Sequence, residues 1–284
     1  MWLKGLALYW AWLFLLIMKL LKDKLTHNDY YQSTEYISNS MLNNLSGRSP
    51  EYFRFAMDNP QPSTAAMKFG SALHVNVLQP EEFNKNYAVS PKFDKRTKIG
   101  KADYAEFQKK NFFKTIITEA EFEMIEQMTM KLMKDSTIKT LLSGGEKEKI
   151  ITWHNEAHNV NCKGMLDCYK KGPNIIVDLK TTQDASYNGF RRSIMKYKYH
   201  KQAAFYMDAI GADEFYIIAI EKSPPFNMNV IQIGEDLIED GRYMYNQELE
   251  IYNYCTKHDY WPGQGYDYLD KDSERIIHVM SKEI

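Results

Sequence analysis

The 284-residue sequence has little cysteine, with single residues at positions 162, 168 and 255 and no C-x-x-C pair. An odd and scattered set of thiols gives no disulfide framework, so we expect the chain in a reducing compartment. The same spacing argues against a cysteine-ligated zinc or iron–sulfur centre. Cys162 and Cys168 lie six residues apart in an expected strand, so we expect both on one face as small buried side chains.

The sequence also lacks an excess of one charge. Its 36 Lys and Arg residues face 37 Asp and Glu residues, which gives a formal net charge of −1. A near-neutral chain has no overall basic field, so local patches would have to bind any polyanion. No internal repeat or low-complexity tract stands out, and 44% of the residues are hydrophobic. The chain is therefore long and apolar enough for one large globular domain or two small ones.

A long hydrophobic run stands at the N-terminus, where GLALYWAWLFLLIM gives 14 uncharged residues between Lys4 and Lys19. This run is shorter than the roughly 18 to 20 residues that span a bilayer, and no small-residue cleavage site follows it. We interpret residues 1–17 as an apolar extension from a start codon placed too far upstream, with Met18 as the native initiator. A membrane anchor is the alternative. We expect a single domain over residues 18–284 and no membrane partner.

Apolar periodicity and turn signals divide that domain into a helical part, a sheet core and a closing helix. Helices with Ser or Thr caps are expected within residues 37–143, for example at SPEYFRFAMDN and TEAEFEMIEQMTMKLMKD. The sheet core is expected over 147–232, with strands at 147–154, 160–169 and 174–180, helices at 184–196 and 198–210, and strands at EFYIIAIEK and MNVIQI. The closing helix is expected at 235–257. This order predicts an α/β fold with a central mixed β-sheet flanked by helices, after an α-helical N-terminal region.

The stretch GMLDCYKKGPNIIVDLKTT, residues 164–182, places charges inside apolar strands. Strand alternation puts Asp178 and Lys180 on one face, and the turn signal KKGPN predicts a hairpin that brings Asp167 beside Asp178. Two neighbouring carboxylates repel each other unless a divalent cation neutralises them. The pattern therefore indicates a hard-metal site with a lysine beside it. A solvated charge pair on an edge strand is the alternative.

Two helices carry polar pairs at a spacing of four residues. Gly70 and His74 share a helical face in KFGSALHVNV, where glycine permits close approach and histidine can point inward. Gln202 and Tyr206 repeat the spacing in YHKQAAFY. Taken alone, each pair is ordinary, because such side chains commonly border a core or face solvent.

Taken together and in order, these motifs resemble those of a known superfamily. G-x-x-x-H at 70–74, Asp167, D-x-K at 178–180 and Q-x-x-x-Y at 202–206 are similar to the RecB-type motifs of PD-(D/E)xK nucleases. The segments MKFGSALHVNVLQPEEFNKNYAV and YKYHKQAAFY resemble, more closely, the exonuclease VIII (RecE-type) branch of phages and prophages. The resemblance covers roughly residues 26–265. One departure is Met165-Leu166, where relatives often have Arg-Pro before the first aspartate.

The resemblance implies a PD-(D/E)xK core and roles for the motif residues. The expected ligands of Mg²⁺, or of Mn²⁺, are His74, Asp167, Asp178 and the backbone carbonyl of Leu179. These donors, with open water positions, suit hard divalent ions. Lys180 would orient or help deprotonate the attacking water, or stabilise charge on the phosphate. Gln202 and Tyr206 would support Lys180 or contact the DNA backbone.

Two basic clusters are candidates for phosphate contacts. One lies in a predicted loop and comprises Lys92, Lys95, Arg96, Lys98 and Lys101. The other flanks the Gln202 helix and comprises Arg191, Arg192, Lys196, Lys198 and Lys201. Because the second cluster is close in sequence to the motif residues, we expect it to bind DNA. Solvated charged faces are the alternative for both.

The resulting hypothesis is a Mg²⁺-dependent 5′→3′ exonuclease that degrades one strand of linear double-stranded DNA. The exposed 3′ strand would serve a phage single-strand annealing protein, and the enzyme would act as a ring-shaped homo-oligomer in the host cytoplasm; these features are implied by the resemblance. The alternatives are a structure- or site-specific endonuclease on the same core, and a catalytically idle DNA-binding or membrane-tethered scaffold.

Overall fold

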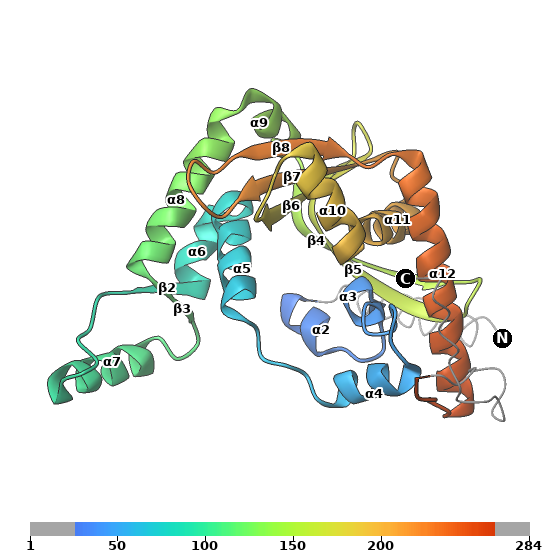
Figure 1. Cartoon of the computed structure of the whole chain (residues 1–284), viewed down its shortest axis with the longest axis horizontal. Helices are drawn as coiled ribbons and strands as arrows, with labels where there is room; N and C mark the ends of the chain where they lie inside the picture. Colours follow the sequence, from blue (N-terminus) through green and yellow to red (C-terminus); the bar gives the residue numbers. More distant parts are fainter. Residues whose placement is uncertain (1–25, 265–284) are drawn as a thin grey trace, which may run out of the picture.

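The computed structural model describes residues 26–264, which form a mixed β-sheet between layers of helices (Figure 1). The strands of this sheet are β1 (Ile37–Ser38), β4 (Glu146–Asn155), β5 (Val160–Lys170), β6 (Ile175–Thr182), β7 (Glu214–Glu221) and β8 (Met228–Gln232). β5 pairs antiparallel with β4 and β6, whereas β6 pairs parallel with β7, and β7 antiparallel with β8. The predicted mixed sheet and the hairpin between β5 and β6 are therefore confirmed.

Hydrophobic side chains on the two faces of the sheet pack into two separate core clusters. Strand β6 shows the alternation, because Ile176 packs in one cluster and Val177 in the other. Residues of the first cluster come from α3 (Asn39–Leu42), α4 (Pro50–Asp58), α10 (Tyr187–Tyr197), α11 (Tyr199–Ile210) and α12 (Glu235–His258). Those of the second come from α5 (Ala65–Leu78), α6 (Pro80–Asn86), α8 (Glu119–Lys134) and α9 (Ser136–Leu142). Helices α5 and α11 therefore approach the sheet from opposite faces.

Side-chain caps set the starts of the helices that the sequence predicted. The Thr118 hydroxyl accepts a hydrogen bond from the Glu121 N–H, and the Glu121 carboxylate accepts one from Thr118 in return, which forms a capping box at α8. The Ser49 and Ser186 hydroxyls cap α4 and α10 by accepting a hydrogen bond from the N–H of Tyr52 and of Gly189. Helices α10 and α11 are joined by Lys198, whose φ of 57° ends one helix and starts the next. Local sequence therefore fixes these boundaries.

The helical part departs from the sequence-based expectation because it contains a second, two-stranded sheet. Strands β2 (Tyr87–Ser90) and β3 (Thr115–Thr118) pair in parallel. Between them α7 (Lys98–Lys110) begins inside the predicted basic loop, because the Thr97 hydroxyl accepts a hydrogen bond from the Gly100 N–H. Figure 1 shows α7 projecting away from the body of the molecule. The remaining described helix, α2 (His27–Gln32), lies at the start of this region.

The expectation that Cys162 and Cys168 share a face is wrong. Both side chains are buried, but Cys162 packs in the first core cluster and Cys168 in the second. Leu166 still packs with Cys162, so the alternation of β5 breaks at Asp167. Because the alternation breaks at Asp167, the direction of the Asp167 side chain is not the one that regular strand alternation would give.

The predicted apolar extension at residues 1–17 lies outside the described residues. Within residues 26–264, none of the helices combines the length and the apolar character needed to cross a membrane.

Candidate active site

The candidate site lies where β5 and β6 separate. The ladder between them runs from Lys170 and Ile175 to Cys168 and Val177, and the next pair would be Asp167 and Asp178. At that point the Leu179 N–H donates a hydrogen bond to the Asp167 carboxylate, with Oδ2 at 2.7 Å. A side chain thus replaces a backbone acceptor, and the two aspartates lie on neighbouring strands as the hairpin predicted.

His74 reaches Asp167 from helix α5. Its Nδ1 atom lies 3.3 Å from Asp167 Oδ2, and both side chains are largely buried. Burial alone would lower the pKa of His74, but the charge and hydrogen bond of Asp167 outweigh it and raise the pKa. Burial would likewise raise the pKa of Asp167, yet His74 and Lys180 hold it below its ordinary value. The structure therefore brings together His74 and Asp167, two of the expected metal ligands.

The helical partner of His74, Gly70, is not needed for close approach. A Cβ atom at Gly70 would lie 3.8 Å from Thr181 Oγ1, which is an ordinary contact. The glycine of the G-x-x-x-H motif therefore has no steric explanation among the described contacts.

Asp178 is held by two side chains and is only 2% exposed. Lys180 Nζ lies 2.6 Å from Asp178 Oδ2, and Gln202 Nε2 donates to Oδ1 at 3.1 Å. Burial raises the pKa of Asp178 to about 6, although Lys180 opposes the shift. For Lys180, burial would lower the pKa, but the charges of Asp178 and Asp167 dominate and raise it. The amine therefore stays protonated beside the carboxylate.

Gln202 of the Q-x-x-x-Y pair lies at the site, but its side-chain partner is not Lys180, which was one of the two expected partners. The Gln202 side-chain amide donates its hydrogen bond to Asp178, which Lys180 also contacts. Tyr206 is buried in the first core cluster, and burial raises its pKa well above the ordinary value. A Cβ atom at Gly164 would lie 2.7 Å from Tyr206 Cε1, so glycine is required beside this ring. The aromatic neighbour of Lys180 is Tyr199, whose ring centroid lies 5.2 Å from Nζ. The sequence motifs did not identify Tyr199.

Sequence reasoning also missed Glu148 on β4. One ligand atom from each of His74, Glu148 and Asp167 lies within 4.8 Å of the other two, and each of these side chains is partly buried. Burial, followed by the charge of Asp167, raises the pKa of Glu148 to about 7. Only the antiparallel register, which places Glu148 opposite Asp167, could have revealed the residue, because no local motif contains it.

This donor set fits a hard divalent ion. Two ligand atoms bound to Mg²⁺ at about 2.1 Å are roughly 3.0 Å apart when adjacent and roughly 4.2 Å apart when opposite. The 3.3 Å between His74 Nδ1 and Asp167 Oδ2 is close to the distance between adjacent ligands, and all three donor atoms lie within 4.8 Å of one another. Imidazole nitrogen and carboxylate oxygens suit Mn²⁺, and the carboxylates suit Mg²⁺.

A cleft of about 760 Å³ opens beside the cluster. Its wall includes His74, Glu148 and Asp167, together with Tyr31 and Tyr87. Phosphate and base groups therefore have space next to the candidate ligands.

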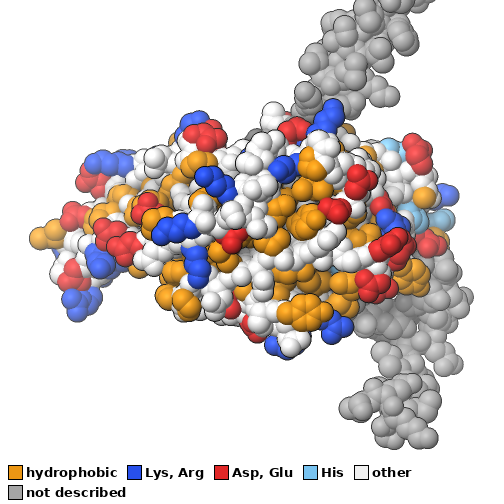
Figure 2. Space-filling view, turned by 90° about the horizontal axis from the view of Figure 1, so that it is seen from above, with side chains coloured by type: hydrophobic (Ala, Val, Ile, Leu, Met, Phe, Trp, Pro, Cys, Tyr) orange, Lys and Arg blue, Asp and Glu red, His pale blue; other side chains and the backbone are white. Residues whose placement is uncertain are grey.

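The basic cluster around α10 is only partly on the surface. Arg191, Arg192 and Lys196 are exposed, and Lys198 is half-buried. The prediction that Lys201 binds DNA is wrong, because its side chain is 0% exposed and forms an ion pair with Glu248, with Nζ 2.5 Å from Oε2. Lys201 points inward from α11 because α12 supplies a buried carboxylate on that side. On the face in Figure 2, Lys and Arg side chains alternate with Asp and Glu instead of forming one band.

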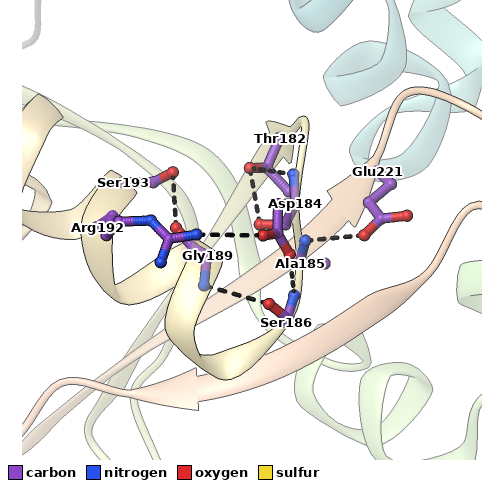
Figure 3. A network of polar contacts seen from close by, with 8 residues as sticks. All are labelled: Thr182, Asp184, Ala185, Ser186, Gly189, Arg192, Ser193 and Glu221. Carbon is purple, nitrogen blue, oxygen red and sulfur yellow. Dashed lines mark hydrogen bonds and ion pairs between the residues drawn. The ribbon is translucent and has the colours of Figure 1, made fainter.

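The turn between β6 and α10 fixes Arg192 near the site strand (Figure 3). Asp184 accepts a hydrogen bond from the Ser186 N–H and lies 3.6 Å from an Arg192 nitrogen. The Ala185 N–H donates to the Glu221 carboxylate on β7. A Cβ atom at Gly189 would lie 2.0 Å from the Asp184 carboxyl group, so only glycine allows this approach. The arrangement holds the start of α10 little more than one turn before Arg191 and Arg192.

The other basic cluster lies around the start of α7. Arg96 and Lys98 are exposed, and the Arg96 guanidinium hydrogen-bonds the Asp94 carboxylate at 2.9 Å. Lys95 lies over the Tyr104 ring, 3.4 Å from its centroid. These side chains are on the projecting part of the molecule, and Arg96 already has a carboxylate partner.

Comparisons with known proteins identify the family and the fold. A family model described as a PDDEXK-like domain of unknown function (DUF3799) matches residues 38–271. No curated protein matches the sequence. A solved structure of a proposed exonuclease from Eubacterium rectale is similar at 18% identity and a TM-score of 0.61, covering 91% of this chain and 97% of that chain. A phage related exonuclease from Haemophilus somnus 129PT has 15% identity and a TM-score of 0.34, covering 57% of this chain and 85% of that chain.

The match to the family model covers most of the chain, and the Eubacterium rectale structure shares the fold. The predicted fold class and superfamily are therefore confirmed. The chain belongs to the PDDEXK-like family DUF3799, and its mixed sheet flanked by helices is a PD-(D/E)xK core.

Proposed function

We propose that this protein is a divalent-metal-dependent deoxyribonuclease that acts on the ends of double-stranded DNA. The observation that carries the proposal is the convergence of His74, Asp167, Asp178 and Lys180 at one break in the sheet. These side chains come from α5, β5 and β6, so only the fold brings them together. Buried charges in this number are costly unless a cation and a substrate complete them.

Mg²⁺ or Mn²⁺ at this centre would supply Lewis acidity to a water molecule and to the scissile phosphate. His74, Asp167, Asp178 and the Leu179 carbonyl are the proposed ligands. In a strand the N–H and C=O of one residue point to the same side, and the Leu179 N–H points at Asp167. The Leu179 carbonyl is therefore expected to face the ligand cluster.

The proposed role of Lys180 is electrostatic. Its pKa is raised, chiefly because the charges of Asp178 and Asp167 outweigh burial, so the amine is protonated at neutral pH. A protonated amine orients a water molecule and stabilises negative charge on the phosphate, whereas it does not remove a proton. Gln202 keeps Asp178 oriented through its hydrogen bond, and Tyr206, one turn further along α11, is buried in the first core cluster.

The finer features of the function follow from the exonuclease VIII resemblance. They are 5′→3′ polarity, a 3′ single strand passed to a phage annealing protein, and action in the host cytoplasm. A ring-shaped homo-oligomer is part of the same proposal. It is supported by charge, because a chain of net charge −1 would need several copies of Arg191, Arg192 and Lys196 to line a channel for DNA. The endonuclease and idle-scaffold alternatives share the fold and differ in the reaction.

The decisive experiment compares end-labelled linear duplex with covalently closed plasmid in Mg²⁺, alongside the solution mass. We expect the linear DNA to be degraded from its ends, the closed circle to survive, and the mass to be that of an oligomer. Rapid cutting of the closed circle would favour the endonuclease alternative. A fully active monomer would rule out the proposed ring-shaped oligomer. The same assay tests Asp178→Asn and Lys180→Ala, which should lower the rate by about a thousandfold or more.

Lys171→Ala is the matched control for the lysine variant, because Lys171 is exposed in the turn between β5 and β6. Circular dichroism and melting curves must show that both site variants are folded. Near-normal turnover by folded Asp178→Asn or Lys180→Ala protein would reject the proposed centre, and an inactive wild-type protein that binds DNA would favour the scaffold.

A further inference from the structure

Glu148 occupies an irregular position near the start of β4. Its φ is 48°, which a non-glycine residue in a strand rarely adopts. The pairs Lys147 with Cys168 and Lys149 with Leu166 flank it, whereas Glu148 and Asp167 form no regular pair. On β5, Leu166 and Cys168 pack in different core clusters, and on β4 Glu146 and Lys149, three residues apart, form an ion pair at 2.9 Å. The backbone of β4 is therefore bent where it faces the break in β5.

A purely structural role does not explain this conformation. Glycine adopts positive φ at no steric cost, and asparagine tolerates it better than glutamate. Among the described side chains, none donates a hydrogen bond to the Glu148 carboxylate, whereas Asp178 is held by both Lys180 and Gln202. Strained residues persist where the surrounding structure holds them in place, and they concentrate at functional sites.

The surroundings of the Glu148 carboxylate are those of a metal ligand. His74 on α5, Glu148 on β4 and Asp167 on β5 present three donor atoms within 4.8 Å of one another. Three separate elements hold them, so the spacing does not depend on one flexible segment. The same three residues line the cleft of about 760 Å³, which leaves room for water and phosphate on the open side.

We propose that Glu148 is a direct ligand of a divalent cation, which it binds together with His74 and Asp167. The bend in β4 directs its carboxylate to that position. This inference rests on the proposed function because the cation is the one that the nuclease would use. It adds a ligand from outside the four sequence motifs, on β4, to those already proposed from α5, β5 and β6.

The test measures Mn²⁺ binding to the purified full-length protein by calorimetry, and the rise in melting temperature that Mn²⁺ causes. Glu148→Gln removes the charge, and Glu148→Gly also relieves the positive φ. We expect both variants to bind Mn²⁺ at least about tenfold more weakly and to lose most of the Mn²⁺-induced rise. Without metal, Glu148→Gly should melt at the wild-type temperature or above it, because the strain is gone. Glu81→Gln, which removes another carboxylate of the same cleft, should stay within about threefold of wild-type affinity.

Folded Glu148 variants that bind Mn²⁺ within threefold of the wild-type affinity would overturn the inference. So would an equal loss in Glu81→Gln, because the effect would then be one of overall cleft charge. If the wild-type protein degrades DNA and the Glu148 variants bind Mn²⁺ normally, this inference fails and the proposed function stands. If Mn²⁺ binding requires Glu148 but no DNA is cut, the proposed function fails and the ligand assignment stands.

Discussion

Acidification should weaken metal binding steeply, because two carboxyl groups at the candidate centre hold protons near neutral pH. The pKa of Glu148 is raised to about 7 and that of Asp178 to about 6, in both cases mainly by burial. A cation at the centre favours the ionised form of each group, so binding releases protons. The affinity of the protein for the cation is therefore highest above pH 7 and falls as the pH drops through these two pKa values.

The two pKa values give the expected size of the effect. If both groups must ionise, the apparent Kd for Mn²⁺ rises about twentyfold between pH 8 and pH 6, and about a thousandfold by pH 5. At pH 6.5 the two groups together release about one proton for each ion bound. His74 adds to the fall, because its pKa is raised by Asp167 despite burial, and only neutral imidazole binds a metal.

Calorimetric titrations from pH 5.5 to pH 8, in two buffers with different ionisation enthalpies, measure both quantities. The difference in apparent enthalpy between the buffers gives the number of protons released. A Kd that varies less than threefold across this range, with no proton release, would refute the reasoning. It would mean that the carboxylates are already ionised in the metal-free protein, or that the ion binds elsewhere.

Two further variants test what the structure changed or left open. Lys201→Met should lower the free energy of unfolding by about 3–5 kcal/mol in urea denaturation, because it leaves Glu248 buried without Lys201. The double variant Lys201→Met/Glu248→Leu should recover most of that loss. Equal stability of Lys201→Met and wild type would contradict the buried ion pair. Arg191→Ala/Arg192→Ala should weaken binding of duplex DNA and reduce the slope of log K against log salt concentration by about two, since each phosphate contact contributes about 0.9. An unchanged slope with unchanged Mn²⁺ affinity would show that these two side chains of α10 do not contact DNA.

Elements governed by local chemistry could be predicted from the sequence. The capping box at Thr118 and Glu121 needs only residues three apart, and the KKGPN turn needs only its own residues to join β5 to β6. That hairpin places Asp167 beside Asp178 without knowledge of the rest of the fold. His74 and Gln202 came from the ordered resemblance, since nothing local to α5 or α11 tells which strand either helix covers.

What sequence reasoning missed depends on tertiary packing. Lys201 has the same local character as Arg191 and Arg192, but it faces a carboxylate from α12 that lies 47 residues later in the chain. Glu148 stands in an alternating run of Glu and Lys, where nothing distinguishes it from the exposed Glu146. Only the register of β4 on β5, and the bend that breaks it, directs Glu148 to the site while Glu146 pairs with Lys149.

The charge at the candidate centre gives an independent reason to expect one divalent ion there. Asp167, Asp178 and Glu148 bring three carboxylates, and Lys180 brings one ammonium group. With a neutral His74, full ionisation leaves two negative charges uncompensated in a partly buried site, and one Mg²⁺ or Mn²⁺ would neutralise both. Without a metal, the site lowers that cost by holding protons, and the raised pKa values of Glu148 and Asp178 express this directly. Protons and the cation therefore compete for the same carboxylates. The change of the apparent Kd with pH measures how strongly these carboxylates bind the cation.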